Sequence, residues 1–413
     1  DMTVFFGFCG IKGYDHLRYP EAHPHSPWSM LELKRTPETN IFDMIREKDL
    51  LIHLPYESFD ESVVNFLYSA ANDKDVLAIK QTLYRVSSSS PVVQALEKAV
   101  QNGKQVTVLM EVKARFDEAN NILMARRLEK AGAHVIYGLV GLKTHSKCTL
   151  VIRREKDGIR RYVHVATGNY NASTAKLYTD LGILTCSDRF GIDASAFFNL
   201  LSGYSDPPIW DSFIVAPINL RQRCIELIDR EIHFAKNGED AHMIAKMNSL
   251  LDKGIIEKLY EASQAGVKIE LIVRGICVLI PGIPGVSDNI TVRSIVGRFL
   301  EHSRIFWFRN GGREELYVSS ADWMPRNLND RVELMVPIED PEIKRRLKQM
   351  VDIELSDNQK AHIMQADGTW LKTISAENQL CAQEYFQKIA EKRDAEDEMT
   401  LAQKLEPYTP VLG

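Results

Sequence analysis

The sequence lacks a long hydrophobic run, an excess of charge of either sign and any bias toward a few residue types. Its apolar stretches, such as the one around Cys277 to Pro281, are broken by proline and glycine and are shorter than the roughly 20 residues of a membrane-spanning helix. Hydrophobic residues account for 45% and charged residues for 26%, which excludes a collagen-like or wholly disordered chain. The 51 basic and 56 acidic residues give a net charge of −5, so we expect no nucleic-acid partner, and any polyanion site must be local.

Cysteine pairs are also absent. The six cysteines lie far apart and form no CxxC motif, which argues against both a zinc framework and a disulfide scaffold and favours a reducing compartment. The first residues have neither a basic segment nor a small-residue cleavage site, so no signal peptide is predicted. We therefore expect a cytoplasmic protein without a membrane span.

The length of 413 residues predicts two to three domains. Residues 1–40 are rich in proline and show no periodicity, and they are interpreted as the remnant of a preceding domain. The paired prolines that end at Pro208 predict a linker, so we expect one domain over 41–208 and a second over 209–395. Residues 396–413 are left as a C-terminal tail.

Helix and strand patterns alternate in the first of these domains. A buried strand over 76–84 is followed by a helix that begins at Pro91, and further strands and helices bring the pattern to 137 as βαβαβ. A run of strands separated by turn residues follows, the first of them over 143–153. The pattern predicts an α/β fold with a mixed, mostly parallel sheet covered by helices.

The second domain repeats the first in outline. Residues 99–110 can be laid against 262–273, because each segment contains a helix end, a capping glycine and a buried strand. Each copy then reaches a histidine with a basic residue two positions on, in His145-Ser-Lys147 and in His302-Ser-Arg304. We therefore expect two duplicated domains that face each other across one cleft.

The H-x-K pattern carries the candidate chemistry. Side chains two apart on a strand point to the same face, so an H-x-K sequence that starts a strand pairs the nucleophile His145 with the phosphate clamp Lys147. An isolated H-x-K is more often a structural histidine beside a solvated lysine. Here Thr167-Gly-Asn169-Tyr-Asn171 follows with amide and backbone donors suited to phosphoryl oxygens, and the second copy repeats the design, which favours the functional interpretation.

Arginines follow apolar runs that read as buried strands. Arg85 and Arg274 each come directly after such a run, and Arg115 follows the strand expected near 105–112. Ligands of open α/β sheets bind outside the carboxyl ends of the strands, and arginine offers planar, bidentate donors for phosphate. A surface ion pair is the simpler explanation for any one of them, but the three together predict a cationic rim.

Several motifs resemble the first class of bacterial polyphosphate kinases over nearly the whole chain. They are LAIK at 77–80, TLYR at 82–85, EVKARFD at 111–117, GLKTHSK at 141–147, HVATGNYN at 164–171, LYTD at 177–180 and IVRGIC at 272–277. The resemblance implies two phospholipase D-like domains that form the C-terminal portion of a longer enzyme, with residues 1–40 left over from a head domain. It also implies a homo-oligomer.

The resemblance implies a role for each matching residue. His145 becomes the phosphohistidine nucleophile and His302 the second catalytic histidine, while Tyr178, Arg274 and His302 match positions that contact ATP. Arg85 and Arg115 match positions assigned to the neighbourhood of Mg²⁺; because guanidinium has no lone pair to offer, we expect them to hold phosphate oxygens while Mg²⁺ binds phosphates and water. Phosphate contacts are also expected from Lys80, Lys147, Asn169, Asn171 and Arg304.

The implied reaction is the reversible transfer of the terminal phosphate of ATP to inorganic polyphosphate, giving ADP and a longer chain. Two alternatives remain open. One is a phosphodiesterase or nuclease of the same fold, although the phospholipase D signature H-x-K-x4-D has Ile152 in place of the aspartate. The other is a noncatalytic phosphate-binding fragment.

Overall fold

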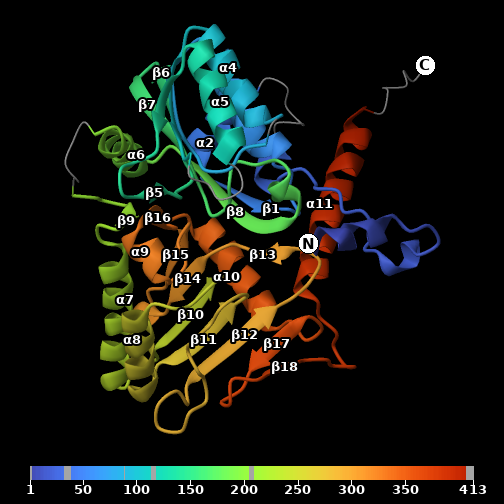
Figure 1. Ribbon diagram of the computed structural model, residues 1–413, viewed down its shortest axis with the longest axis vertical. Helices are drawn as coiled ribbons and strands as arrows, with labels where there is room; N and C mark the ends of the chain where they lie inside the picture. Colours follow the sequence, from blue (N-terminus) through green and yellow to red (C-terminus); the bar gives the residue numbers. More distant parts are fainter. Residues whose placement is uncertain (1, 32–38, 88, 113–117, 204–208, 406–413) are drawn as a thin grey trace, which may run out of the picture.

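The computed structural model describes residues 2–31, 39–87, 89–112, 118–203 and 209–405. Two sheets lie one above the other along the long axis of the molecule, the first built mainly from residues 50–185 and the second mainly from 214–372 (Figure 1). The described residues therefore form two α/β units, as predicted. The proposed boundary at 208/209 lies beside residues 204–208, which are outside the described part of the chain.

The first sheet has the strand order β1-β8-β7-β6-β2-β3-β4. Helices α3, α4 and α5 share a core with one face of this sheet, whereas α6 packs against the other face. The strands are β1 (Leu50–Leu54), β2 (Val76–Leu83), β3 (Gln105–Met110), β4 (His134–Tyr137), β6 (Cys148–Glu155), β7 (Gly158–Ala166) and β8 (Tyr178–Thr185). The helices are α2 (Ile41–Glu47), α3 (Asn65–Asn72), α4 (Pro91–Gln101), α5 (Glu118–Ala131) and α6 (Asp188–Leu201).

The second sheet has the order β18-β17-β12-β11-β10-β14-β15-β16-β5, and β9 also pairs with β16. Helices α7 and α8 cover its outer face, while α10 lies on the inner face in a core shared with α6. The strands are β9 (Ile214–Ala216), β10 (His242–Met247), β11 (Lys268–Val273), β12 (Ile290–Ile295), β14 (Ile305–Phe308), β15 (Glu315–Ser319), β16 (Arg331–Pro337), β17 (Ala361–Met364) and β18 (Trp370–Lys372). The helices are α7 (Leu220–Lys236), α8 (Lys253–Gln264), α9 (Pro325–Asn329), α10 (Pro341–Leu355) and α11 (Ala382–Leu405).

The internal repeat is confirmed by the secondary structure. Helix α4 begins where Ser90 accepts a hydrogen bond from the Val93 backbone with Pro91 in the first turn, and it ends before Gly103 at φ +78°, after which β3 begins. Helix α8 and β11 repeat this order around Gly266 at φ +99°. A positive φ is accessible to glycine at little cost, so both glycines are suited to turn the chain from helix to strand.

Both sheets are mixed, as predicted, but the prediction that most strand pairs are parallel is wrong. Among the strands of the described residues, only the β2-β3-β4 and β10-β11-β12 runs and the short strands β5 and β13 (Leu300–Glu301) pair in parallel, and antiparallel pairs outnumber parallel pairs in both sheets. Helices connect the strands of the two parallel runs. Strands β6, β7 and β8 follow one another through short connections, and such strands pair antiparallel.

Two short strands cross from one unit to the other. Strand β5 (Lys143–Thr144) pairs with β16 of the second sheet, and β13 pairs with β8 of the first sheet. The strand expected over 143–153 is therefore broken at 145–147. The reason is that the backbone N–H groups of His145 and Ser146 both donate to the Val332 carbonyl of the other unit, so these residues leave the first sheet.

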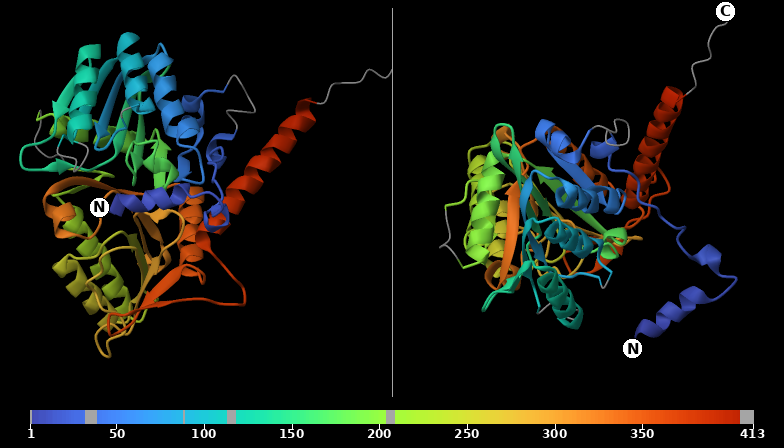
Figure 2. Two further views of the ribbon diagram at one scale, coloured as in Figure 1. Left: turned by 45° about the vertical axis from the view of Figure 1, so that its right-hand side comes forward. Right: turned by 90° about the horizontal axis from the view of Figure 1, so that it is seen from above.

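The first residues of the chain lie away from both sheets. Seen from above, residues 2–17 extend away from the sheets (Figure 2), and side chains such as Phe5, Phe8 and Leu17 are exposed, whereas the Tyr19 ring lies 5.7 Å from the Arg298 guanidinium. Among the described residues, none of the helices is long and apolar enough to cross a bilayer.

Candidate active site

The two H-x-K-type segments occupy matching places at the junction of the sheets. Each histidine directly follows a two-residue strand that has crossed to the other sheet, His145 after β5 and His302 after β13. Each basic partner, Lys147 or Arg304, comes directly before the strand that returns to its own sheet. The crossing places each histidine beside the opposite unit.

His145 is held by a carboxylate of the second unit. Its Nδ1 lies 2.9 Å from Oε2 of Glu333 on β16, which is fully buried. The Asn327 amide donates to the other carboxylate oxygen at 2.5 Å, and the Ser320 hydroxyl also donates to Glu333. The ring of Tyr84 packs edge-on against the imidazole at 4.8 Å. These contacts fix the orientation of the imidazole.

The same contacts define the protonation state of His145. Burial raises the pKa of Glu333, but hydrogen bonds from His145 and Ser320 and the charge of Lys147 outweigh burial and lower it. Glu333 is therefore ionised and can only accept, so Nδ1 of His145 carries the proton. Burial, followed by the charge of Lys147, lowers the pKa of His145 to about 3 even though Glu333 raises it. Nε2 is therefore the ring nitrogen with a lone pair at neutral pH, as a nucleophile requires.

Lys147 is also buried, with 2% of its surface exposed. Its ammonium donates to the His145 carbonyl and lies 5.6 Å from the centre of the Tyr84 ring. Burial and the nearby charges of Arg304 and Arg331 lower the pKa of Lys147 to about 7, although Glu333 raises it. An anionic ligand would restore the charged form, which suits a phosphate clamp.

His302 mirrors this arrangement on the first unit. Its Nδ1 lies 2.9 Å from both carboxylate oxygens of Asp180 on β8, and the Thr167 hydroxyl donates to Asp180 at 2.6 Å. Burial and Arg304 lower the pKa of His302 although Asp180 raises it. Gly168 permits this packing, because a Cβ there would lie 2.2 Å from Oδ2 of Asp180.

The basic partner of His302 belongs to a polar network. Arg304 is 3% exposed, donates to Oδ1 of Asp322 at 3.2 Å and donates to the His302 carbonyl at 2.7 Å. Asn248 donates to Asp322 at 3.0 Å and accepts from Arg274 at 2.5 Å. Arg274 therefore follows β11, as predicted, and reaches the His302 half of the site.

Arg85 lies at the other half of the site. It follows β2 and lines a pocket of about 430 Å³ between the two units. The remaining lining residues are Tyr84, Gly141 and Lys143 from the first unit and Arg326, Asp330 and Arg331 from the second. Four cations against one carboxylate make this pocket suitable for an anion.

Not all of the other predicted site residues lie at the two histidines. Tyr178 packs against the His302 ring at 5.2 Å, and Oδ1 of Asn169 is buried without a hydrogen-bond partner in the described part of the chain. Oδ1 of Asn171 instead accepts from the Ser173 and Thr174 backbones, so this atom holds a turn. Lys80 lies inside β2 between Thr107 and Leu150, away from the strand end. Arg115 falls outside the described residues.

Glu333 and Asp180 are site residues that the sequence interpretation missed. Each is an acidic residue inside an otherwise apolar strand, and a buried charge without a partner is costly. An acidic residue in such a strand therefore indicates a buried carboxylate that has a partner. The pattern could not identify the partners, because Glu333 lies 188 residues from His145 and Asp180 lies 122 residues from His302.

The described residues include no group of three or more histidine, cysteine, aspartate or glutamate side chains that could hold an ion. Arg85 has no lone pair to donate, so it fits a phosphate that itself carries the metal.

The buried position of His145 predicts that its imidazole stays neutral well below the ordinary histidine pKa of about 6.5. In a chain labelled with ¹⁵N at histidine, we expect the His145 ring nitrogens to keep their neutral shifts from pH 8 to pH 5. Added free histidine should titrate in the same samples. Protonation of His145 near pH 6.5 would contradict the proposed electrostatics.

Comparison with known proteins gives consistent results. A family model described as Polyphosphate kinase C-terminal domain 1 matches residues 40–207, and one described as Polyphosphate kinase C-terminal domain 2 matches residues 213–383. The chain is 56% identical over 363 residues to a polyphosphate kinase of Halalkalibacterium halodurans, covering 87% of this chain and 51% of the relative. It is 54% identical to one of Synechocystis, covering 95% of this chain and 57% of the relative. The chain thus spans about half the length of these curated relatives.

Solved structures show the same fold. The crystal structure of polyphosphate kinase from Porphyromonas gingivalis aligns with a TM-score of 0.84 at 37% identity, over 92% of this chain and 57% of that one. The structure of phosphatidylserine synthase from Haemophilus influenzae aligns with a TM-score of 0.50 at 12% identity, over 85% of this chain and 94% of that one, which bears on the fold alone. The prediction of two α/β units is confirmed by the match to the polyphosphate kinase structure.

Proposed function

The chain belongs to the polyphosphate kinase family, and from this premise we propose that it transfers the terminal phosphate of ATP reversibly to inorganic polyphosphate through a phosphohistidine at His145. One observation carries the proposal: the neutral imidazole of His145 is held at Nδ1 by Glu333, which leaves the Nε2 lone pair available, and it packs against Tyr84, a residue of the cationic pocket wall. A nucleophile so placed and oriented suits phosphoryl transfer, in which positioning and electrostatics dominate catalysis.

Two in-line displacements account for the transfer. In the first, Nε2 of His145 attacks the γ-phosphorus, the bond from phosphorus to the bridging oxygen breaks, and its electron pair leaves on ADP. In the second, a terminal oxygen of the polyphosphate chain attacks that phosphorus, and the electron pair of the P–N bond returns to Nε2. A phosphoramidate keeps a high transfer potential, so the reaction runs in both directions, whereas a serine phosphate ester would trap the group.

The buried cations would stabilise charge on the transferring phosphoryl group. Lys147 and Arg304 lie close enough at the junction that the charge of Arg304 contributes to lowering the pKa of Lys147, and the charges of both contribute to lowering the pKa of His302. Arg85 would hold the phosphates on the His145 side, while Arg274 and Tyr178 would contact the nucleotide on the His302 side. Bound to the phosphates of ATP, Mg²⁺ would supply further charge neutralisation.

His302 would move a proton in this scheme. Its Nδ1 donates to the ionised Asp180, so its Nε2 can accept a proton from a terminal phosphate oxygen and return it in the reverse direction. The contact between Nδ1 and Asp180 would stabilise the imidazolium that forms.

Reversing the charge of Arg85 tests the cationic rim. In Arg85→Glu, we expect polyphosphate synthesis to fall about 100-fold or more with both short and long chains, because the pocket would repel phosphate. Arg154→Glu makes the same charge change at an exposed position of β6 and should behave like the unmodified chain. Unchanged rates in Arg85→Glu would refute the proposed rim.

The proposal is tested with Mg²⁺ and γ-labelled ATP. We expect protein-bound label that is labile in acid and stable in base, and labelled polyphosphate with ADP should give the same label. Label from polyphosphate with ADP but not from ATP would show that the chain forms the phosphohistidine but does not bind ATP productively. No label from either donor would contradict the proposal and leave the phosphate-binding fragment and the phosphodiesterase as the remaining alternatives.

The cellular context follows from the same premise. A cytoplasmic location suits the six free cysteines. Assembly into a homo-oligomer and the absence of a nucleic-acid partner stay predictions.

A further inference from the structure

A cluster of three charged side chains is buried in the second unit beside β13. Lys246 on β10, Glu301 on β13 and Glu354 on α10 are each less than 5% exposed. The Lys246 ammonium donates to Oε2 of Glu301 at 2.6 Å and also contacts Glu354. Such a cluster costs much desolvation energy, so it calls for a role beyond stability.

The cluster is connected to the backbone of His302. The Thr179 hydroxyl donates to Oε2 of Glu301 at 2.8 Å and accepts a hydrogen bond from the His302 N–H at 3.2 Å. On the other side, the Gln383 amide of α11 donates to Oε1 of Glu301 at 2.6 Å. The carboxylate of Glu301 is therefore fixed from three elements.

The position of this connection in the fold is specific. Strand β13 pairs with β8 only through Leu300 beside Tyr178 and Glu301 beside Thr179. The next residue on each side is His302 and Asp180, the pair that forms the second histidine site. A two-residue strand has too few backbone hydrogen bonds to hold itself in register, so side chains must supply the remaining constraint.

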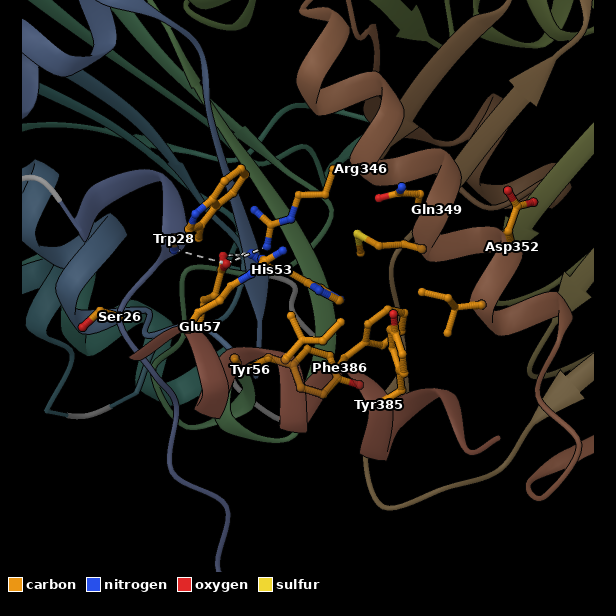
Figure 3. A pocket seen from close by; sticks show the side chains of 15 residues that line it. Ser26, Trp28, His53, Tyr56, Glu57, Arg346, Gln349, Asp352, Tyr385 and Phe386 are labelled. Atoms are coloured by element: carbon orange, nitrogen blue, oxygen red, sulfur yellow. Dashed lines mark hydrogen bonds and ion pairs between the residues drawn. The ribbon is translucent and has the colours of Figure 1, made fainter. Parts of the chain in front are cut away.

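Aromatic rings lie near the cluster. Tyr56 packs against Phe299 at 5.6 Å and against Phe386 at 5.5 Å. The charges of Glu301 and Glu354 add to burial in raising the pKa of Tyr56. Figure 3 shows Tyr56, His53 and Phe386 in the wall of a pocket of about 350 Å³ outside these rings. Tyr56 thus lines this pocket and also lies close enough to the charged cluster to be affected by its carboxylates.

We propose that Lys246 is a positioning residue, which fixes Glu301 and, through the Thr179 hydroxyl, holds His302 in register with Asp180 across the junction of the two units. The expected effect of Lys246 on the rate of His145 phosphorylation rests on the proposed function, whereas its expected effect on the contact between His302 and Asp180 does not. Lys246 itself need not contact substrate.

The experiment follows the geometry directly in chains labelled with ¹⁵N at histidine. The proton shared by His302 Nδ1 and Asp180 should give a downfield resonance, assigned by its loss in Asp180→Asn. We expect Lys246→Met and Thr179→Val to lose or shift this resonance and to slow phosphorylation of His145 about 10- to 100-fold. Val is nearly isosteric with Thr and suits a strand, so Thr179→Val tests the link from Glu301 to His302, on which the proposal depends, even if Lys246→Met does not fold.

A matched control is the same substitution at a surface lysine that also binds two carboxylates. Lys258 on α8 also binds two carboxylates, Asp229 at 2.8 Å and Glu261 at 2.7 Å, but at the surface. Lys258→Met should keep the resonance and the rate. A Thr179→Val chain with an unchanged resonance and an unchanged rate would overturn the proposal. A resonance lost as expected in a chain that never becomes phosphorylated would support the positioning role and count against the proposed function alone.

Discussion

Replacing His145 by alanine is expected to abolish protein-bound phosphate and to lower polyphosphate synthesis by more than about 10⁴-fold. The reason is that the alanine variant has no imidazole lone pair beside Glu333, and the imidazole of His302 is held by a different carboxylate, Asp180. The measurement is the acid-labile label from γ-labelled ATP together with the rate of chain elongation.

Two further variants distinguish loss of the nucleophile from misfolding as the cause of a lost label. His145→Ala leaves the buried carboxylate of Glu333 without its imidazole partner, whereas the amide of His145→Gln can still donate to it. Both should lose the label, and His145→Gln should keep the thermal midpoint of the unmodified chain more closely. His134→Ala, at an exposed position on β4, should label normally. Retention of label in His145→Gln would show that the nucleophile is a different residue.

Neutralising Glu333 is expected to lower the rate constant for phosphorylation of His145 by about 10²- to 10⁴-fold while the KM for ATP changes little. In Glu333→Gln the volume is preserved, but the charge that fixes the proton on Nδ1 and stabilises positive charge on the ring is lost. Since the charge of Glu333 raises the pKa of His145, its removal cannot slow the reaction by protonating the imidazole.

The control for this variant is the same chemical change at the surface. Glu97 pairs with Arg127 at 2.5 Å on the outside of the first unit, and Glu97→Gln should keep the normal rate. A rate within a few-fold of normal in Glu333→Gln would contradict the role assigned to this carboxylate. A raised KM at a constant kcat would show that Glu333 acts in binding rather than on the nucleophile.

The sequence was informative where the signal is local. Pro91 and Gly103 bound a helix whose limits are correct within a residue, and the repeat of this unit around Gly266 predicted the duplication. The two histidines were identified because each is followed by a basic residue two positions on, in both copies. Arg85 and Arg274 were placed at strand ends from the apolar runs that precede them.

The sequence was uninformative where the structure depends on contacts between the two units. The crossing of β5 and β13 to the opposite sheets has no local signal, because each strand contains only two residues. This crossing brings His145 to Glu333 and His302 to Asp180, so the orienting carboxylates could not be assigned either. The assumption that residues 145–147 lie on a strand was wrong for the same reason, although His145 and Lys147 do lie together.

The two duplicated units contribute equivalent parts to the site. Each unit supplies one histidine and the carboxylate that orients the histidine of the other unit. Neither half is complete alone, so separation of the two units should disable both histidines together.

The most direct test of the account is to map the phosphate in the unmodified chain after incubation with Mg²⁺ and γ-labelled ATP. Digestion and mass spectrometry under alkaline conditions preserve a phosphoramidate. The account predicts a single phosphorylated peptide that contains residues 143–148, with the phosphate on His145. Phosphate on His302 or on another residue, with His145 unmodified, would contradict the central claim.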